Sequence, residues 1–223
     1  MAELSGASFA NLAKKKMKKN NVSTIAIAIV VVAAIGLLIW GVSENKTSAP
    51  AVDEHGMPIA ANTSAQPLNE LVNKSAPDFA LADKDGKIYS LNELRGKNII
   101  LFFNEGLMCY PACWNQIVAL ARDERFKNTD TVVLSIVIDQ PEEWQKAVKQ
   151  MPELAEATVV FDKDAMISKQ LGVLTTASSM HYGLFPGHTY VVIDKEGIIR
   201  YVFDDPNMGI RNDQLATELS KLN

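Results

Sequence analysis

The segment that most constrains the fold is residues 98–117, with the sequence NIILFFNEGLMCYPACWNQI. It begins with a continuous apolar run, typical of a strand buried on both faces, and ends in a stretch typical of a helix. Between them a short loop carries Cys109 and Cys113, the only two cysteines of the chain. This pattern predicts a buried strand that delivers two thiols to the start of a helix.

The position and spacing of the two cysteines predict their chemistry. A helix N-terminus carries partial positive charge and free N–H groups, so it stabilises a thiolate over a thiol. Residues four apart lie on one helix face with Cβ atoms about 5–6 Å apart, and modest fraying would let the sulfurs bond. Two such thiolates would also suit one soft metal ion. We expect a reactive pair that faces water; a metal site and two inert buried cysteines are the alternatives.

The N-terminal part of the chain predicts a membrane anchor. Residues 1–21 carry five lysines and one acid, and residues 22–42 are apolar and uncharged. A helix of that length spans about 30 Å, which matches the hydrocarbon core of a bilayer. The positive-inside rule predicts a cytoplasmic tail over 1–21, a single transmembrane helix over 22–42 and an extracytoplasmic C-terminal domain at the cell membrane. A cleaved signal peptide is the alternative, but it would have a shorter apolar run.

The remaining residues divide into a linker and a folded domain. Residues 43–75 are rich in small and polar residues without an apolar period, which predicts a flexible linker. From residue 76 to 223, strand-like runs alternate with helical ones and indicate an α/β domain with a mainly parallel sheet covered on both faces. We expect strands at 79–81, 87–91, 99–104, 131–138, 158–161, 188–194 and 198–203, and helices at 111–126, 141–150, 165–171 and 212–222.

The charge distribution bears on the choice of partner. The whole chain has a net charge of −4 although its first 43 residues are basic, so the domain itself is acidic. An acidic domain is a poor match to the phosphate backbone, and we therefore expect no nucleic-acid partner.

Four stretches, taken in order, resemble a known family. They are APDFALADKDGKIYSLNELRGKNIILFF, the cysteine loop, VVFDKDAMISKQLGV and HTYVVIDKEGIIRYV. Residues 75–223 resemble the thioredoxin-fold redoxins, and most of all the alkyl hydroperoxide reductase/thiol-specific antioxidant (peroxiredoxin) family. The resemblance implies a thioredoxin-like fold, in which helices flank a central mixed sheet with an N-terminal hairpin. It also implies a cofactor-free oxidoreductase with antioxidant activity, a thiol electron donor and a small peroxide or disulfide substrate. Cys109, nearest the loop tip, would attack, and Cys113 would resolve.

The chain departs from the peroxiredoxin pattern at the positions that hold the peroxide. That family carries Thr or Ser three residues before the attacking cysteine, and an Arg near the start of a later strand. Here Gly106 stands three residues before Cys109, Tyr110 stands three before Cys113, and His188 stands where the Arg would fall. Glu105 is a further candidate, as a proton acceptor beside Cys109.

A second resemblance is to the Sco copper-delivery proteins, which are single-span anchors with a C-x3-C loop and a distant histidine. It implies a copper site made by Cys109, Cys113 and His188. The loop here reads CYPAC, without a proline after the first cysteine, and Gly187 stands where that family has Asp. A third alternative is a catalytically silent redoxin-fold module that docks a partner.

Overall fold

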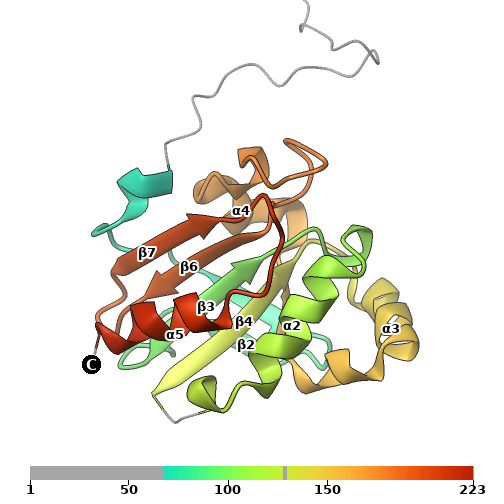
Figure 1. Ribbon diagram of the computed structural model, residues 1–223, viewed down its shortest axis with the longest axis horizontal. Helices are drawn as coiled ribbons and strands as arrows, with labels where there is room; N and C mark the ends of the chain where they lie inside the picture. Colours follow the sequence, from blue (N-terminus) through green and yellow to red (C-terminus); the bar gives the residue numbers. More distant parts are fainter. Residues whose placement is uncertain (1–67, 128–129, 223) are drawn as a thin grey trace, which may run out of the picture. The chain divides into compact units, whose positions relative to one another are not determined.

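The computed structural model describes residues 68–127 and 130–222. They form a seven-stranded sheet in the order β2-β1-β5-β4-β3-β6-β7, with helices packed on both faces (Figure 1). The strands are β1 Ala80–Asp83, β2 Ile88–Ser90, β3 Asn98–Phe103, β4 Thr131–Val137, β5 Val159–Phe161, β6 Thr189–Ile193 and β7 Ile199–Asp204. The principal helices are α2 Ala112–Arg122, α3 Pro141–Gln150, α4 Met166–Gln170 and α5 Asn212–Ser220.

The sheet is mixed, and the expectation of a mainly parallel sheet from strand–helix alternation is wrong. Only β3, β4 and β5 pair in parallel, and the other neighbours pair antiparallel. Two tight hairpins, β1–β2 and β6–β7, build the edges of the sheet, and a tight turn can join only antiparallel strands. Each hairpin also joins the central strands in an antiparallel pair, β1 with β5 and β6 with β3. The mixed sheet and the N-terminal hairpin that the family resemblance implies are both confirmed.

The central strand β3 explains why the domain has two cores. All of its residues are buried, and alternate side chains point to opposite faces of the sheet. Ile99, Leu101 and Phe103 pack in the core beneath α4, while Ile100 and Phe102 pack in the core beneath α2, α3 and α5. The second core also contains both cysteines, so the sulfur site is an extension of that core.

The helix that follows the cysteines is shorter than predicted. The apolar pattern predicts a helix over 111–126, but α2 ends at Arg122 and a 3-10 turn, Glu124–Phe126, follows. The break lies at Asp123, whose extended backbone lets its carboxylate accept the Arg125 N–H. An aspartate that caps a new turn competes with continuation of the helix. The expected helix over 141–150 coincides with α3.

The structure describes the end of the predicted linker but not the predicted anchor. Within the predicted linker of residues 43–75, Leu68–Leu71 forms a 3-10 helix and Leu71 is buried. Ser75 forms a β-bridge with Ile198, so the last part of that segment belongs to the folded domain. The predicted tail (1–21) and transmembrane helix (22–42) lie outside the described residues. Within the described part of the chain, no helix has the length and apolar character that crossing a membrane requires.

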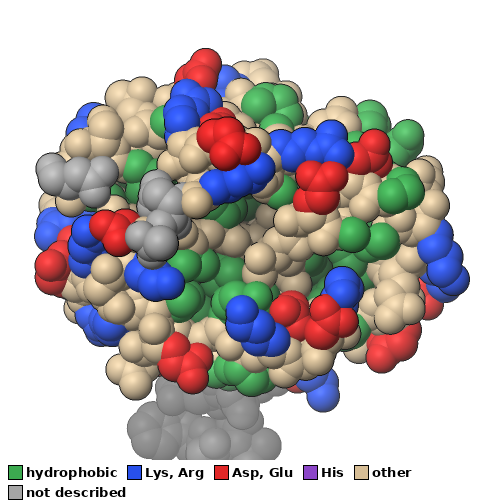
Figure 2. Space-filling view, turned by 90° about the horizontal axis from the view of Figure 1, so that it is seen from below, with side chains coloured by type: hydrophobic (Ala, Val, Ile, Leu, Met, Phe, Trp, Pro, Cys, Tyr) green, Lys and Arg blue, Asp and Glu red, His purple; other side chains and the backbone are tan. Residues whose placement is uncertain are grey.

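The surface of the domain mixes both charge signs. Figure 2 shows Lys and Arg side chains beside Asp and Glu side chains around hollows that expose hydrophobic groups. Exposed ion pairs occur on the described surface, such as Arg122 with Glu156 and Lys127 with Glu124. The face in Figure 2 therefore presents no extended patch of one charge sign.

Candidate functional site

Cys109 and Cys113 are joined by a disulfide at the start of α2, with Cα atoms 5.4 Å apart. Cys109 directly follows the 3-10 turn Gly106–Met108, and Cys113 is the second residue of α2. The two cysteines are only 2% and 1% exposed. The expectation of a pair that faces water is therefore wrong for this disulfide form, because the cysteines belong to the core beneath α2.

The loop around the disulfide nevertheless reaches the surface. Met108 and Tyr110, on either side of Cys109, are 53% and 58% exposed. Behind the loop, the Cys109 Sγ lies 4.0 Å from the Sδ of Met208, a residue of the segment after β7. Cys109 is thus buried beneath a thin loop whose neighbouring residues are open to solvent.

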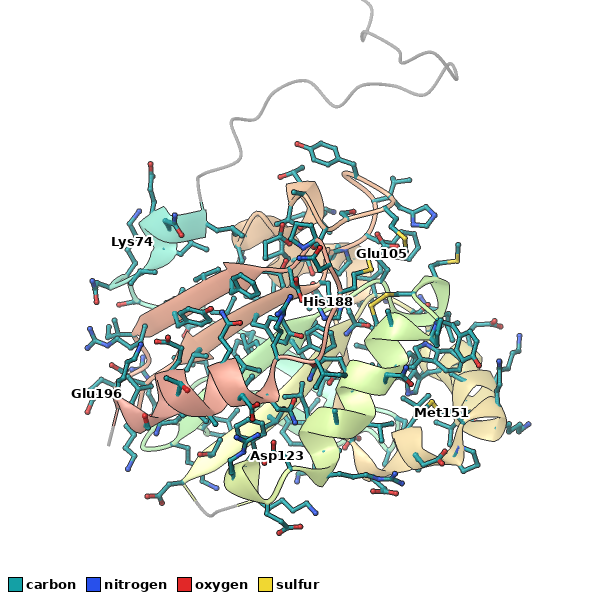
Figure 3. The ribbon with its side chains drawn as sticks, viewed as in Figure 1. Lys74, Glu105, Asp123, Met151, His188 and Glu196 are labelled. Atoms are coloured by element: carbon teal, nitrogen blue, oxygen red, sulfur yellow. A yellow bond between two sulfur atoms is a disulfide. The ribbon has the colours of Figure 1, made fainter. Side chains whose placement is uncertain are left out.

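His188 lies against the other sulfur. It directly precedes β6, is 1% exposed, and places its Nδ1 3.4 Å from the Cys113 Sγ (Figure 3). Its Nε2 lies 2.8 Å from the Tyr190 hydroxyl. Burial lowers the pKa of His188 to about 4, so the imidazole is neutral near pH 7. Burial also raises the pKa of Tyr190, which keeps the phenol protonated.

The structure brings together the three predicted metal-ligand candidates. The Sγ atoms of Cys109 and Cys113 and the nearest ring nitrogen of His188 lie within 4.8 Å of one another. A disulfide, however, offers no thiolate to a metal. The donor set fits a soft ion only after the pair has been reduced.

Glu105 has a structural role in place of the proposed role as a proton acceptor. Its carboxylate is buried and accepts the backbone N–H of Met180 at 2.5 Å and that of His181 at 3.0 Å. It also contacts the His181 Nδ1 at 2.8 Å and accepts the Ser179 hydroxyl at 3.3 Å. These partners occupy both carboxylate oxygens, so Glu105 ties the segment after η6 (Val173–Thr175) to the cysteine loop.

Asp139 supports the cysteine loop from the adjacent strand end. It follows β4, and its Oδ2 accepts the Leu107 N–H at 3.2 Å. Burial raises the pKa of Asp139 to about 6. A Cβ at Gly106 would lie 1.7 Å from the same oxygen, and Gly106 has a φ of +54°. The position three residues before Cys109 therefore has no room for the Thr or Ser side chain that the family pattern places there.

Two residues of the site were missed by the sequence analysis, although the sequence carries a signal for each. Tyr190 stands two residues after His188 in the strand segment 188–194, and residues two apart in a strand share a face. Asp139 closely follows the strand next to the one that leads into the cysteine loop, and parallel strands end at the same edge of a sheet. The contact of Met208 with Cys109 has no comparable signal, because it depends on the path of a loop.

Comparison with known proteins places the chain in a family. The AhpC/TSA family model matches residues 72–202, more than half of the chain. A chloroplastic peroxiredoxin Q from Populus jackii is 31% identical over 143 residues, covering 60% of this chain and 61% of that protein. A protein named peroxiredoxin bcp from Haemophilus influenzae is 31% identical over 144 residues, covering 60% of this chain and 85% of that protein. The chain thus spans about three fifths of the length of its plant relatives.

Solved structures share the same fold. A peroxiredoxin-like protein from Aquifex aeolicus has a TM-score of 0.56 at 18% identity, covering 68% of this chain and 87% of that one. Peroxidoxin BcpB from Mycobacterium tuberculosis has a TM-score of 0.55 at 21% identity, covering 68% of this chain and 97% of that one. The mixed sheet and flanking helices described above are therefore a thioredoxin-like fold, and the chain belongs to the AhpC/TSA family.

Proposed function

We propose that this protein is a thiol-dependent oxidoreductase that reduces peroxides or disulfides through Cys109 and Cys113. The observation that carries the proposal is the disulfide between them, which lies at a helix start beside a buried histidine. Membership of the AhpC/TSA family and similarity to peroxiredoxins support the same reaction class.

The reaction with a peroxide follows from the chemistry of the pair. The Cys109 thiolate attacks the O–O bond, an alcohol or water leaves, and Cys109 becomes a sulfenic acid. The Cys113 thiol then condenses with it, which releases water and forms the disulfide. Two equivalents of a donor thiol restore the reduced pair by thiol–disulfide exchange. With a disulfide substrate, the same two cysteines attack and resolve in turn, without the sulfenic acid.

Turnover of both substrate classes by the full chain tests the proposal. Hydrogen peroxide and a small disulfide are offered with a thiol donor, and Cys109→Ser and Cys113→Ser serve as controls. We expect consumption that both substitutions abolish. No turnover above the Cys109→Ser control would contradict the proposal and favour the silent module. In that case we expect a potential of the pair below about −300 mV, typical of a structural disulfide.

We propose that the domain acts outside the cytoplasm, held to the lipid bilayer by residues 22–42. The proposal is supported by the uncharged apolar run and the lysines that precede it. Expression of the full chain and of a chain without residues 1–42, followed by membrane fractionation, tests the anchor. Protection of the domain from added protease in intact spheroplasts would contradict an extracytoplasmic location.

A second candidate function is copper binding by Cys109, Cys113 and His188. It is favoured by one specific observation, the approach of three soft or borderline donor atoms within 4.8 Å. We expect the reduced chain to bind one equivalent of Cu(I), and we expect His188→Ala to weaken that binding. His55→Ala is the matched control. Equal affinity in the His188→Ala variant would exclude the three-ligand site.

A further inference from the structure

We propose that His188 and Tyr190 form a buried relay that stabilises Cys113 as the leaving sulfur when an incoming thiol opens the disulfide at Cys109. The inference rests on the proposed thiol–disulfide function and assigns roles within it. His188 contacts a reacting atom and is the catalytic residue of the relay. Tyr190 acts through the imidazole, to which its hydroxyl is hydrogen-bonded, and is a positioning residue.

The hydrogen-bond inventory of the site selects one tautomer of His188. Among the described residues, the Tyr190 hydroxyl makes one hydrogen bond, to the Nε2 of His188. If the phenol donates, Nε2 accepts and the ring proton lies on Nδ1, directed at the Cys113 Sγ. If instead Nε2 carries the proton, the buried phenol has no acceptor and Nδ1 faces a sulfur that carries no proton. Buried donors are almost always paired, so the geometry favours the proton on Nδ1.

Packing holds the imidazole in this orientation. The Phe102 ring stacks on Tyr190 at 4.8 Å and meets His188 edge-on at 4.6 Å between centroids. The backbone carbonyl of His188 accepts the Asp205 N–H at 2.9 Å, which fixes the start of β6. All three rings are fully buried, so neither His188 nor Tyr190 can exchange its partner for water without a rearrangement of the core.

The charges that face the relay are balanced. Asp205 acts on both rings, and it forms an ion pair with Arg211 at 2.6 Å. Asp204 also acts on His188, Tyr201 acts on Tyr190, and the Gly209 carbonyl favours a proton on the imidazole. Desolvation outweighs these influences and keeps the imidazole neutral near pH 7. The role of the relay rests on its geometry, in which the imidazole lies 3.4 Å from the Cys113 Sγ and 2.8 Å from the Tyr190 hydroxyl.

The reaction step balances without an added acid. An incoming thiolate attacks the Cys109 Sγ, a new S–S bond forms to Cys109, and the Cys109–Cys113 bond breaks. The electron pair of the broken bond stays on the Cys113 Sγ, which becomes a thiolate that accepts a hydrogen bond from the His188 Nδ1–H. A better stabilised thiolate leaves faster. Cys113 also lies in the first turn of α2, so two influences make it the leaving sulfur and direct attack to Cys109.

Nitrogen NMR of the full chain labelled at histidine tests the tautomer directly. The chain has three histidines, so loss of one signal in His188→Gln assigns the ring. In the oxidised protein we expect the His188 proton on Nδ1, and in Tyr190→Phe we expect it to move toward Nε2. A wild-type ring protonated on Nε2 alone would overturn the proposal, and that measurement does not depend on whether any variant folds.

The rate of disulfide opening by excess 2-mercaptoethanol tests the chemical role. We expect Tyr190→Phe to slow opening about tenfold, because without the phenol the ring proton can move from Nδ1 to Nε2 and the Cys113 thiolate then loses its hydrogen bond. Tyr201→Phe is the matched control, because its hydroxyl bonds Gln214 and not His188, and we expect no change in its rate. We also expect the mixed disulfide with 2-mercaptoethanol, when trapped, to lie on Cys109. Equal rates in the two variants, or trapping on Cys113, would overturn the proposal.

These experiments separate failure of the relay from failure of the proposed function. Chemical opening by a small thiol requires only the disulfide, whereas the proposed function requires catalytic turnover of a peroxide or disulfide. Slow opening in Tyr190→Phe without any turnover by the wild type would support the relay and reject the function. Turnover by the wild type, together with an opening rate and a tautomer that Tyr190→Phe leaves unchanged, would support the function and reject the relay.

Discussion

Gly106 and Asp139 show how single residues shape the cysteine loop. The carboxylate of Asp139 occupies the space that a side chain at position 106 would need, and it holds the turn before Cys109 through the Leu107 N–H. A peroxide at this site therefore cannot be held by a hydroxyl at position 106. If the protein reduces peroxides, it must polarise them with other groups, and His188, 3.4 Å from the Cys113 Sγ, is a candidate.

We expect Gly106→Ala to destabilise the fold more than Gly86→Ala does. Both glycines have positive φ, so both substitutions carry a backbone cost of about 1 kcal/mol or more. Only at Gly106 would the new Cβ also meet a carboxylate oxygen, whereas nothing lies within 4 Å at Gly86. Urea unfolding of the two variants measures the difference, and equal losses of unfolding free energy would contradict the close approach of Asp139.

We expect Asp139→Asn to stabilise the protein at pH 7 and to have little effect at pH 4. Burial raises the pKa of Asp139 from its ordinary value of 3.8 to about 6, so between these values the native state holds more protons than the unfolded state. Stability therefore falls as pH rises across this window, by up to about 2 kcal/mol. Urea unfolding of both proteins from pH 4 to pH 7 measures the difference in unfolding free energy. A difference that does not change with pH would show that the pKa of Asp139 is ordinary.

At the scale of elements, the segment between η6 and β6 is fastened to the cysteine loop by one buried carboxylate. Glu105 receives donors from Ser179, Met180 and His181, and no other contact in the described structure joins these two segments through so many hydrogen bonds. The same segment exposes Tyr182 and Leu184, and it is held by two carboxylates, Glu105 and Asp204, of which Asp204 accepts hydrogen bonds from Ser178. Its order should therefore depend on Glu105.

We expect Glu105→Ala to loosen that segment while the sheet stays folded. Removal of the acceptor leaves several donors without a partner, at about 1–3 kcal/mol for each group that stays buried. Amide hydrogen exchange at Met180 and His181 should rise about tenfold or more, with β3 and β6 unchanged. Glu196→Ala, at an exposed turn, is the control (Figure 3). Unchanged exchange at both amides would show that another contact orders the segment.

At the scale of the whole molecule, the disulfide closes a very short loop within an already packed core. The two cysteines are four residues apart, and both belong to the core that α2, α3 and α5 cover. A short loop removes little entropy from the unfolded chain, so the stability of the fold comes mostly from the two cores. The pair is therefore free to cycle between oxidised and reduced forms without unfolding the domain.

We expect reduction of the disulfide to lower the free energy of unfolding by about 2 kcal/mol, the value for so short a loop. Urea unfolding with and without a reductant measures the change. The Cys109→Ser/Cys113→Ser variant, which has no disulfide, should have the same free energy of unfolding with and without the reductant. Unfolding of the wild type by reductant alone would mean that the disulfide is a structural requirement and would weigh against a redox cycle.

The sequence by itself determined the local elements and the placement of the cysteines. The apolar run of β3, the limits of α3 and the delivery of two thiols to a helix start all follow from short-range patterns. Such patterns are reliable because strand and helix periodicities are set by neighbouring residues. The same short-range patterns predicted an end of α2 beyond Arg122, and only the family resemblance implied the mixed pairing of the sheet.

Apart from His188, which the Sco resemblance had grouped with the two cysteines, only the tertiary structure decided what surrounds the sulfurs. His188 is 75 residues from Cys113 in sequence, and Met208 is 99 residues from Cys109. Three features depend on such distant contacts: the burial of the disulfide, the space next to Gly106 that Asp139 fills, and the hydrogen bonds by which Glu105 holds the segment after η6. The physical reason is that solvent exposure and hydrogen-bond partners belong to the packed chain, and no local pattern of residues specifies them.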